Sequence, residues 1–324
     1  MDIKKLFLLE KKATKGLLPH EWVIIGYAVL TFCFVLIGWE SYSNISALAW
    51  TRVKLVGATL ALWGIYRLAP CRMSMLLRIV VQLILLGEWY PDTYEINKVL
   101  PNLDHVVAQW EQSIFNMQPG QTFSETMPWW WVSEPMHLGY GSYYFLLGGI
   151  PLLYFLHRYD EFLRTSFIVL SAFFAFYLFF DLMPVTGPQF YFEAVGLDKI
   201  REGIFPEMGT YFATHQECLP IPGADGPFKA FVQIMHDAGE RPTAAFPSSH
   251  VGASTVLLML AIRFCRKQKS WTTMYWFMPL YTLLCFSTVY IKAHYAVDAM
   301  AGIPFGIVFY FILAAIYDRI KVKG

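Results

Sequence analysis

Residues 287–317 read STVYIKAHYAVDAMAGIPFGIVFYFILAAIY, and they fix the class of fold. Residues 299–317 carry no charged side chain, so they predict a helix able to cross the roughly 30 Å apolar layer of a membrane. His294 and Asp298 stand at the mouth of this helix. Their spacing of four predicts that the imidazole and the carboxylate share one helical face. Ionisable groups beside the apolar layer are costly, so the pair indicates a functional site.

The composition of the whole chain agrees with a membrane protein. Of its 324 residues, 56% are hydrophobic and 15% are charged, and the mean hydropathy is +0.43. An ordinary soluble domain is far more polar. The net charge of +1 and the lack of a basic tract argue against a nucleic-acid partner. The five cysteines lack C-x-x-C spacing, so neither a disulfide framework nor a zinc site is implied.

Apolar runs divide the chain into about eight predicted transmembrane helices. We therefore predict an all-α, polytopic membrane bundle, in which residues 1–70 form a two-helix extension and residues 71–324 form the catalytic domain with a six-helix core. The predicted helices lie near residues 22–39, 53–69, 73–89, 143–156, 166–184, 249–265, 271–291 and 299–317.

Alternating loops place most of the 25 basic residues on the face that also holds both termini. The positive-inside rule makes that face cytoplasmic, so the long connections 90–142 and 185–248 and both histidine blocks are predicted outside the cytoplasm. Loops of this length usually carry function, and the second is expected to cap the site. The short basic termini and compact loops favour a bacterial inner membrane.

A second histidine block, residues 246–250, reads FPSSH immediately before an apolar run. Ser248 is predicted to be the N-cap of that helix. The backbone N–H groups around Ser249 and the positive end of the helix dipole would then favour an anion such as phosphate. His250 would project from the first turn toward the same place.

The two blocks resemble signatures of the type 2 phosphatidic acid phosphatase superfamily, P-S-x-H and S-R-x5-H-x3-D. Pro247, Ser248 and His250 fill the first of these, and Ser287, His294 and Asp298 fill the second, with Thr288 at the position of the arginine. The further signature K-x6-R-P aligns best with residues 183–192, where Gln189 replaces the arginine and the lysine is absent. The sequences of these blocks are similar to those of the inositol phosphorylceramide synthase branch, and the similarity extends over residues 90–310.

The resemblance implies a mechanism without a metal or cofactor. His294, oriented by Asp298, would attack phosphorus and form a phosphohistidine, while protonated His250 would donate to the leaving alkoxide. Ser248, Ser249 and two replacement cations would hold the phosphate oxygens. The candidate cations are Lys292 and Arg241, which could also be surface cations.

Asp181, near the end of an apolar run, is either a hydroxyl-binding carboxylate for a polyol headgroup or a solvated helix-end aspartate.

Three functions remain open on the sequence. The first is a phosphotransferase that moves a phosphoinositol-type headgroup from a phospholipid donor to a lipid alcohol such as ceramide. The second uses the same site with water, as a lipid phosphate or polyprenyl pyrophosphate phosphatase. The third is a non-catalytic membrane carrier or scaffold in which the two histidines bind haem or pack. The oligomeric state is not predicted by any of these patterns.

Overall fold

The computed structural model describes residues 6–10 and 13–323, and helices are the regular elements of that part of the chain. The long helices are α1 (Pro19–Ile37), α2 (Ile45–Leu68), α3 (Arg72–Asn97), α6 (Trp130–His157), α7 (Tyr159–Leu182), α11 (Ser249–Gln268), α12 (Thr272–Tyr290) and α13 (Ala296–Lys323). The short ones are α4 (Asp104–Phe115), α5 (Pro119–Thr126), α8 (Pro188–Val195), α9 (Leu197–Arg201) and α10 (Pro227–Gly239), with single 3₁₀ turns at Trp39–Ser41 and Tyr211–Ala213. The all-α prediction is therefore confirmed.

Each of the eight predicted apolar segments overlaps one of the long helices. Five of these helices in the described residues, α1, α2, α3, α7 and α13, are long and apolar enough to cross a membrane. This finding fits an integral membrane protein. Helix α6 begins at Trp130, well before the predicted residue 143. Its first turns carry buried polar groups, such as Glu134 and His137, and pack against α10 and α12. Because these turns contain polar residues, hydropathy alone did not identify them as part of the helix.

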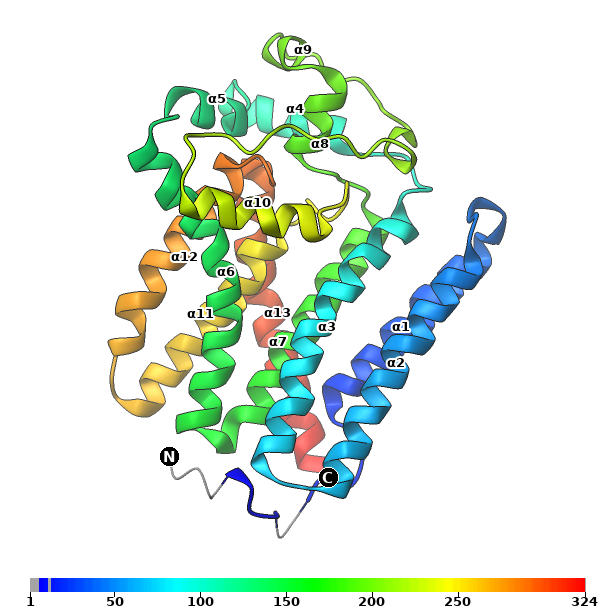
Figure 1. The fold of residues 1–324 in the computed structure, drawn as a ribbon, viewed down its shortest axis with the longest axis vertical. Coiled ribbons are helices and arrows are strands. Elements are labelled where there is room, and N and C mark those ends of the chain that lie inside the picture. Colours follow the sequence, from blue (N-terminus) through cyan, green and yellow to red (C-terminus); the bar gives the residue numbers. More distant parts are fainter. Residues whose placement is uncertain (1–5, 11–12, 324) are drawn as a thin grey trace.

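The short helices gather at one end of the long ones (Figure 1). Helices α4, α5, α8, α9 and α10 lie across this end, while the C-terminal end of α13 lies at the opposite end. We call the short helices and their connections, residues 98–129 and 184–247, the cap. It covers the end of the bundle at which α11 and α13 begin.

The N-terminal hairpin joins the other helices through buried polar side chains. Helix α1 packs against α7, and α2 packs against α3. The Arg78 guanidinium of α3 forms a bidentate ion pair with the Glu21 carboxylate of α1, and both side chains are fully buried. This pairing explains how α3 carries an arginine within an apolar segment, because a buried charge requires a partner.

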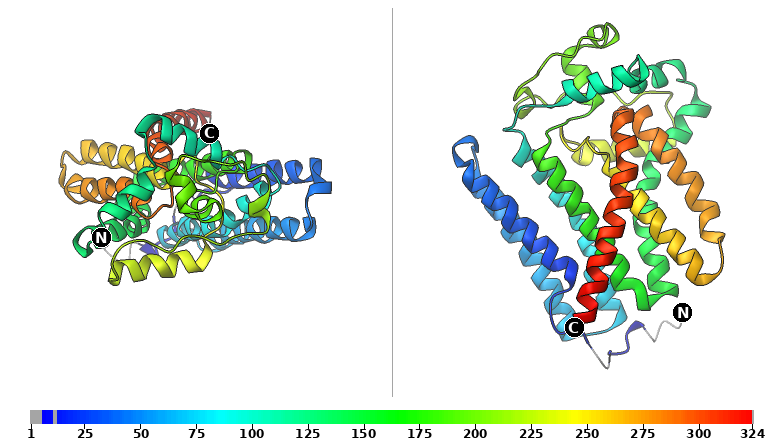
Figure 2. Two further views of the ribbon diagram at one scale, coloured as in Figure 1. Left: turned by 90° about the horizontal axis from the view of Figure 1, so that it is seen from above. Right: turned by 180° about the vertical axis from the view of Figure 1, so that it is seen from behind.

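Helices α11 and α13 approach each other closely because glycines line their contact. A Cβ on Gly306 would lie 2.3 Å from the carbonyl oxygen of Gly252, and one on Gly302 would lie 2.7 Å from the carbonyl oxygen of Ser248. Small residues allow helix backbones to pack this tightly inside a membrane. In Figure 2, right, α13 lies in front, beside α7 and α11.

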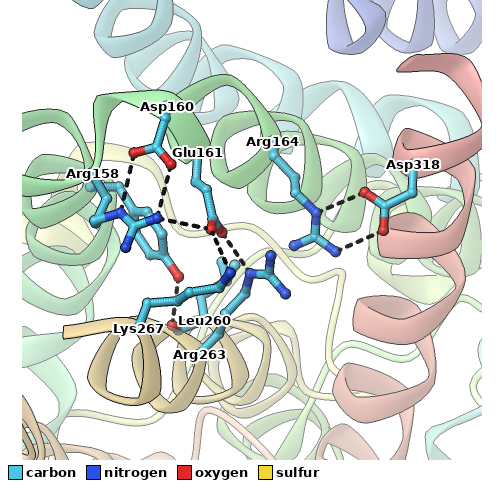
Figure 3. Close-up of polar contacts among 9 residues, drawn as sticks. Arg158, Asp160, Glu161, Arg164, Leu260, Arg263, Lys267 and Asp318 are labelled. Atoms are coloured by element: carbon cyan, nitrogen blue, oxygen red, sulfur yellow. Dashed lines mark hydrogen bonds and ion pairs between the residues drawn. The ribbon is translucent and has the colours of Figure 1, made fainter. Parts of the chain in front are cut away.

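An ion-pair network ties α7, α11 and α13 together at the end of the bundle opposite the cap (Figure 3). The Glu161 carboxylate of α7 accepts a hydrogen bond from Arg263 Nε of α11 at 2.6 Å, and Lys267 Nζ lies 3.8 Å from it. Arg164 of α7 donates to Asp318 of α13 at 3.1 Å. These contacts fix the far end of the helices whose near ends form the site.

We expect Gly306→Ala to destabilise the protein by about 1–3 kcal/mol, because the added methyl group has no room between α11 and α13. The measurement is thermal unfolding of the purified protein in detergent micelles. Gly64→Ala in α2 is the matched control, since nothing lies within 4 Å of its added Cβ. Equal unfolding midpoints for the two variants would contradict the close packing.

Candidate active site

The first turn of α11 presents the FPSSH block to the cap. Ser248 is the N-cap, as the sequence predicts, and its Oγ accepts a hydrogen bond from Val251 N at 3.3 Å. Its backbone N–H donates to the Asp298 carbonyl oxygen at 3.1 Å, which links the starts of α11 and α13. Ser248 is buried, whereas Ser249 is partly exposed. The Ser248 hydroxyl is thus used inside the protein, where it satisfies the Val251 N–H group of the first turn.

The structure brings His250 and His294 into direct contact. His250 Nδ1 lies 3.1 Å from His294 Nε2, and the two ring planes meet at 66°. Tyr140 and Tyr143 of α6 pack on the His250 ring with centroid distances of 4.9 and 4.5 Å. Two histidines that are 44 residues apart in sequence therefore lie side by side in the fold.

The second ring nitrogen of His294 determines its tautomer. Nδ1 lies 2.8 Å from the carbonyl oxygen of Ala245, which can only accept a hydrogen bond. Nδ1 therefore carries the hydrogen, and Nε2 of the neutral ring keeps its lone pair. Burial lowers the pKa of His294 to about 4, although the Ala245 carbonyl and Glu240 oppose this shift. At neutral pH the imidazole is uncharged, and the lone pair of Nε2 faces His250 Nδ1.

Asp298 lies near His294 but does not form a hydrogen bond with it. The nearest carboxylate oxygen is 3.8 Å from His294 Nδ1, which is beyond hydrogen-bond range. That oxygen accepts a hydrogen bond from Tyr295 N at 2.8 Å and so caps α13. Because α13 begins only at Ala296, His294 lies in the turn before the helix. The two residues therefore do not share a helical face, and the prediction of a shared face is wrong.

Two buried carboxyl groups on α4 support this turn, and the sequence reasoning did not identify either. Asp104 accepts hydrogen bonds from Thr186 N at 2.6 Å, Gly187 N at 2.9 Å and Tyr295 Oη at 3.0 Å. Glu111 accepts one from Val297 N at 3.2 Å. Burial and, secondarily, the charge of Asp298 raise the pKa of Glu111 to about 8. The seven-residue spacing of Asp104 and Glu111 was an available signal, because it places both on one helical face.

The remaining candidate residues are divided between the site and other parts of the fold. Gln189 lies in α8, where its Nε2 donates to Glu240 Oε1 at 2.9 Å. Arg241 is exposed and donates to the backbone oxygen of Glu240 at 3.1 Å. The Lys292 ammonium group instead donates to Ser124 Oγ of α5 at 2.7 Å. Asp181 is buried and accepts a hydrogen bond from Tyr27 Oη of α1 at 2.9 Å, so it is not a solvated helix end.

No cation replaces the signature arginine at Thr288. This side chain is fully buried, and its hydroxyl donates to the Cys285 carbonyl oxygen within α12 at 3.0 Å. Its own carbonyl oxygen accepts a hydrogen bond from His294 N at 3.1 Å. Thr288 thus helps to hold the backbone of the turn that carries His294, and its side chain adds no positive charge there.

A large apolar cavity opens onto His250. Its volume is about 790 Å³, and it extends between α3, α6 and α7 from Ser249, His250 and Glu240 to Leu76 and Phe162. Leu76 and Tyr90 both line it, and at 1.5 Å per residue they are about 21 Å apart along α3. Apart from its polar end, the lining is aliphatic and aromatic. Such a cavity suits the hydrocarbon chain of a lipid.

The chain matches the sequence model of the PAP2 superfamily over residues 105–312, which is well over half of its length. The matched segment contains the cap from residue 105 onward, both histidine blocks and helices α6, α7, α11 and α12. Comparison with curated proteins gave no significant match. Comparison with solved structures gave none either. The chain belongs to the PAP2 superfamily, whose signatures the two histidine blocks resemble.

Proposed function

We propose that this protein is a lipid phosphotransferase that works through a phosphohistidine on His294. The observation that carries the proposal is the 3.1 Å contact between His250 and His294 at the polar end of an apolar cavity. Membership of the PAP2 superfamily supports a phosphatase-type or phosphotransferase-type lipid enzyme. A nucleophile, a proton donor and space for a lipid chain are thus adjacent.

In the first half-reaction, Nε2 of His294 attacks the phosphorus atom of the donor lipid. The new N–P bond forms as the bond from phosphorus to the leaving oxygen breaks. His250, whose cation is favoured by the negatively charged phosphate group of the bound donor, gives its proton to that oxygen. The phosphorylated imidazole is positively charged, with its Nδ1–H held by the Ala245 carbonyl oxygen. Asp298, 3.8 Å away, stabilises this charge without a direct hydrogen bond. The first-turn N–H groups of α11 stabilise the phosphate oxygens.

In the second half-reaction, an acceptor hydroxyl takes the phosphoryl group from His294 and His250 accepts its proton. We propose a phosphoinositol-type donor and a ceramide-like lipid alcohol as acceptor, on the resemblance of the histidine blocks. The apolar cavity beside His250 favours a lipid acceptor over water. Arg158, Arg164, Arg263 and Lys267 gather at the end opposite the cap (Figure 3). By the positive-inside rule that end faces the cytoplasm, and the site faces the outer side of a bacterial inner membrane.

The geometry offers no support for haem binding by the two histidines. Their ring nitrogens are 3.1 Å apart, within hydrogen-bond distance. Two imidazole ligands on opposite sides of one iron ion would each need a metal–nitrogen bond of about 2 Å, which requires a wider separation. The phosphatase with the same site is the remaining alternative. It is identified by release of inorganic phosphate or a phosphorylated headgroup with no new lipid.

We expect His294→Ala to abolish turnover, because it removes the nucleophile. The assay incubates purified protein with labelled phosphatidylinositol and ceramide, follows new lipid by mass spectrometry, and traps acid-labile phosphoenzyme. His215→Ala is the control, since this exposed cap histidine stacks on Tyr211 away from the site. A well-folded His294→Ala protein with an unchanged rate would eliminate the covalent mechanism.

We expect Asp298→Asn to lower the rate by up to about 10³-fold, because the phosphorylated imidazole loses a countercharge that is 3.8 Å away. A direct hydrogen bond that set the tautomer would cost about 10⁴-fold. Asparagine can still cap α13, so the unfolding midpoint should hold. Asp298→Ala is the comparison and should also lose about 1 kcal/mol of stability. An unchanged rate for Asp298→Asn would show that this charge has no role.

We expect the rate of phosphoenzyme formation to fall near pH 4 on the acidic side of its pH profile. Burial lowers the pKa of His294 to about 4. Only the neutral ring is a nucleophile, so protonation of His294 abolishes the attack as the pH falls through this value. Rapid-quench measurement of labelled phosphoenzyme across the acidic range tests this expectation. An acid limb near 6.5, the ordinary value for histidine, would show that the imidazole is solvated.

A further inference from the structure

Glu240 is a partly exposed carboxyl group that the mechanism above does not use. It follows α10 and lines both the large apolar cavity and a smaller one of about 20 Å³ next to Gln189 and His236. Burial raises the pKa of Glu240, and the nearby His294 is the first of the groups that oppose this shift. The carboxyl group thus lies at the polar end of the cavity, close to the two histidines.

The hydrogen bonds of Glu240 leave one of its oxygens available. Gln189 Nε2 donates to Oε1 at 2.9 Å, and Tyr90 Oη lies 3.5 Å from the same oxygen. Arg241 donates to the backbone oxygen of Glu240 and not to the carboxyl group. Within residues 6–10 and 13–323, no group donates a hydrogen bond to Oε2. A carboxyl oxygen at the polar end of an apolar cavity gains a hydrogen bond when a ligand there supplies a donor.

The charge of Glu240 limits what that ligand is. A carboxylate repels a phosphate group, so Glu240 does not hold the phosphate oxygens. A hydroxyl group is a suitable partner, because a carboxyl oxygen accepts its hydrogen bond in either protonation state. Gln189 is neutral, whereas the arginine of the family signature at this position would form an ion pair with the carboxylate. The exchange of arginine for Gln189 therefore leaves Glu240 free to select a neutral hydroxyl donor.

We propose that Glu240 binds the hydroxyl group of a lipid alcohol whose hydrocarbon chain occupies the cavity. This inference rests on the proposed phosphotransferase function and assigns the acceptor site within it. The bound oxygen is directed at the phosphorus atom on His294. As the new P–O bond forms, the P–N bond breaks, its electron pair returns to His294 Nε2, and the hydroxyl proton passes to His250. Glu240 thereby positions the hydroxyl group, and the apolar cavity favours the lipid alcohol over water.

The test measures binding without reaction, in a His294→Ala background reconstituted in nanodiscs. The probes are radiolabelled ceramide and the same lipid with its primary hydroxyl group converted to a methyl ether. We expect the alcohol to bind on the order of tenfold more tightly than the ether, since hydrogen bonds to a charged group are of that strength. Adding Glu240→Met, which removes both oxygens at similar volume, should abolish this preference by weakening the alcohol alone.

Two further variants separate the hydrogen bond from the shape of the cavity. Glu240→Gln keeps a carbonyl oxygen that accepts the hydroxyl hydrogen, so most of the preference should remain. Gly148 lines the cavity, and nothing lies within 4 Å of a Cβ added there. Gly148→Trp should fill the cavity and weaken both lipids equally. Glu240→Ala replaces Glu240→Met in the assay if the methionine variant unfolds.

Several outcomes would overturn the assignment. A preference that survives Glu240→Met would do so, and so would an equal loss for the alcohol and the ether. Weaker phosphatidylinositol binding with unchanged ceramide binding would assign Glu240 to the donor headgroup instead. The proposed function is tested separately, on protein with His294 intact. If that protein makes no new lipid while the binding preference depends on Glu240, the transferase proposal fails and the alcohol site stands.

Discussion

The close backbone contact between α11 and α13 is the constraint on which the site depends. Gly302 and Gly306 of α13 leave no space for a side chain against the backbone of α11. The Ser248 amide can therefore reach the Asp298 carbonyl oxygen at the mouth of the pair. His250 and His294 meet at 3.1 Å because the two helices begin side by side. Any side chain larger than hydrogen at this contact would move the two imidazoles relative to each other.

The cap holds the histidine turn with buried polar contacts. Asp104 connects α4 to the backbone of Thr186 and Gly187 and to the Tyr295 hydroxyl. Glu111 does the same for the first turn of α13 through Val297 N. Buried carboxyl groups are costly unless they receive hydrogen bonds, and these receive them from backbone groups that would otherwise lack acceptors. The cap is thus a rigid support for the turn that carries His294.

The electrostatics of the site differ from what two arginines would give. Gln189 and Thr288 are neutral, Lys292 is engaged with Ser124, and Arg241 contacts a backbone oxygen. The first turn of α11 then contributes positive potential to the site through its helix dipole. Glu240 adds a carboxyl group at the mouth of the apolar cavity. This balance supports the proposed singly charged phosphodiester donor and neutral lipid acceptor.

The sequence by itself determined the all-α class, the eight apolar segments and the two histidine blocks, because hydropathy and helix-start residues act over a few neighbouring positions. It also placed Ser248 as an N-cap, a contact that spans only three residues. Only the tertiary structure decided that the Ala245 carbonyl holds His294 Nδ1, that Asp181 pairs with Tyr27, and that Glu240 borders the cavity. Ala245 and His294 are 49 positions apart in the sequence, and Tyr27 and Asp181 are 154 positions apart. No local pattern encodes such distances, since they follow from how the helices pack.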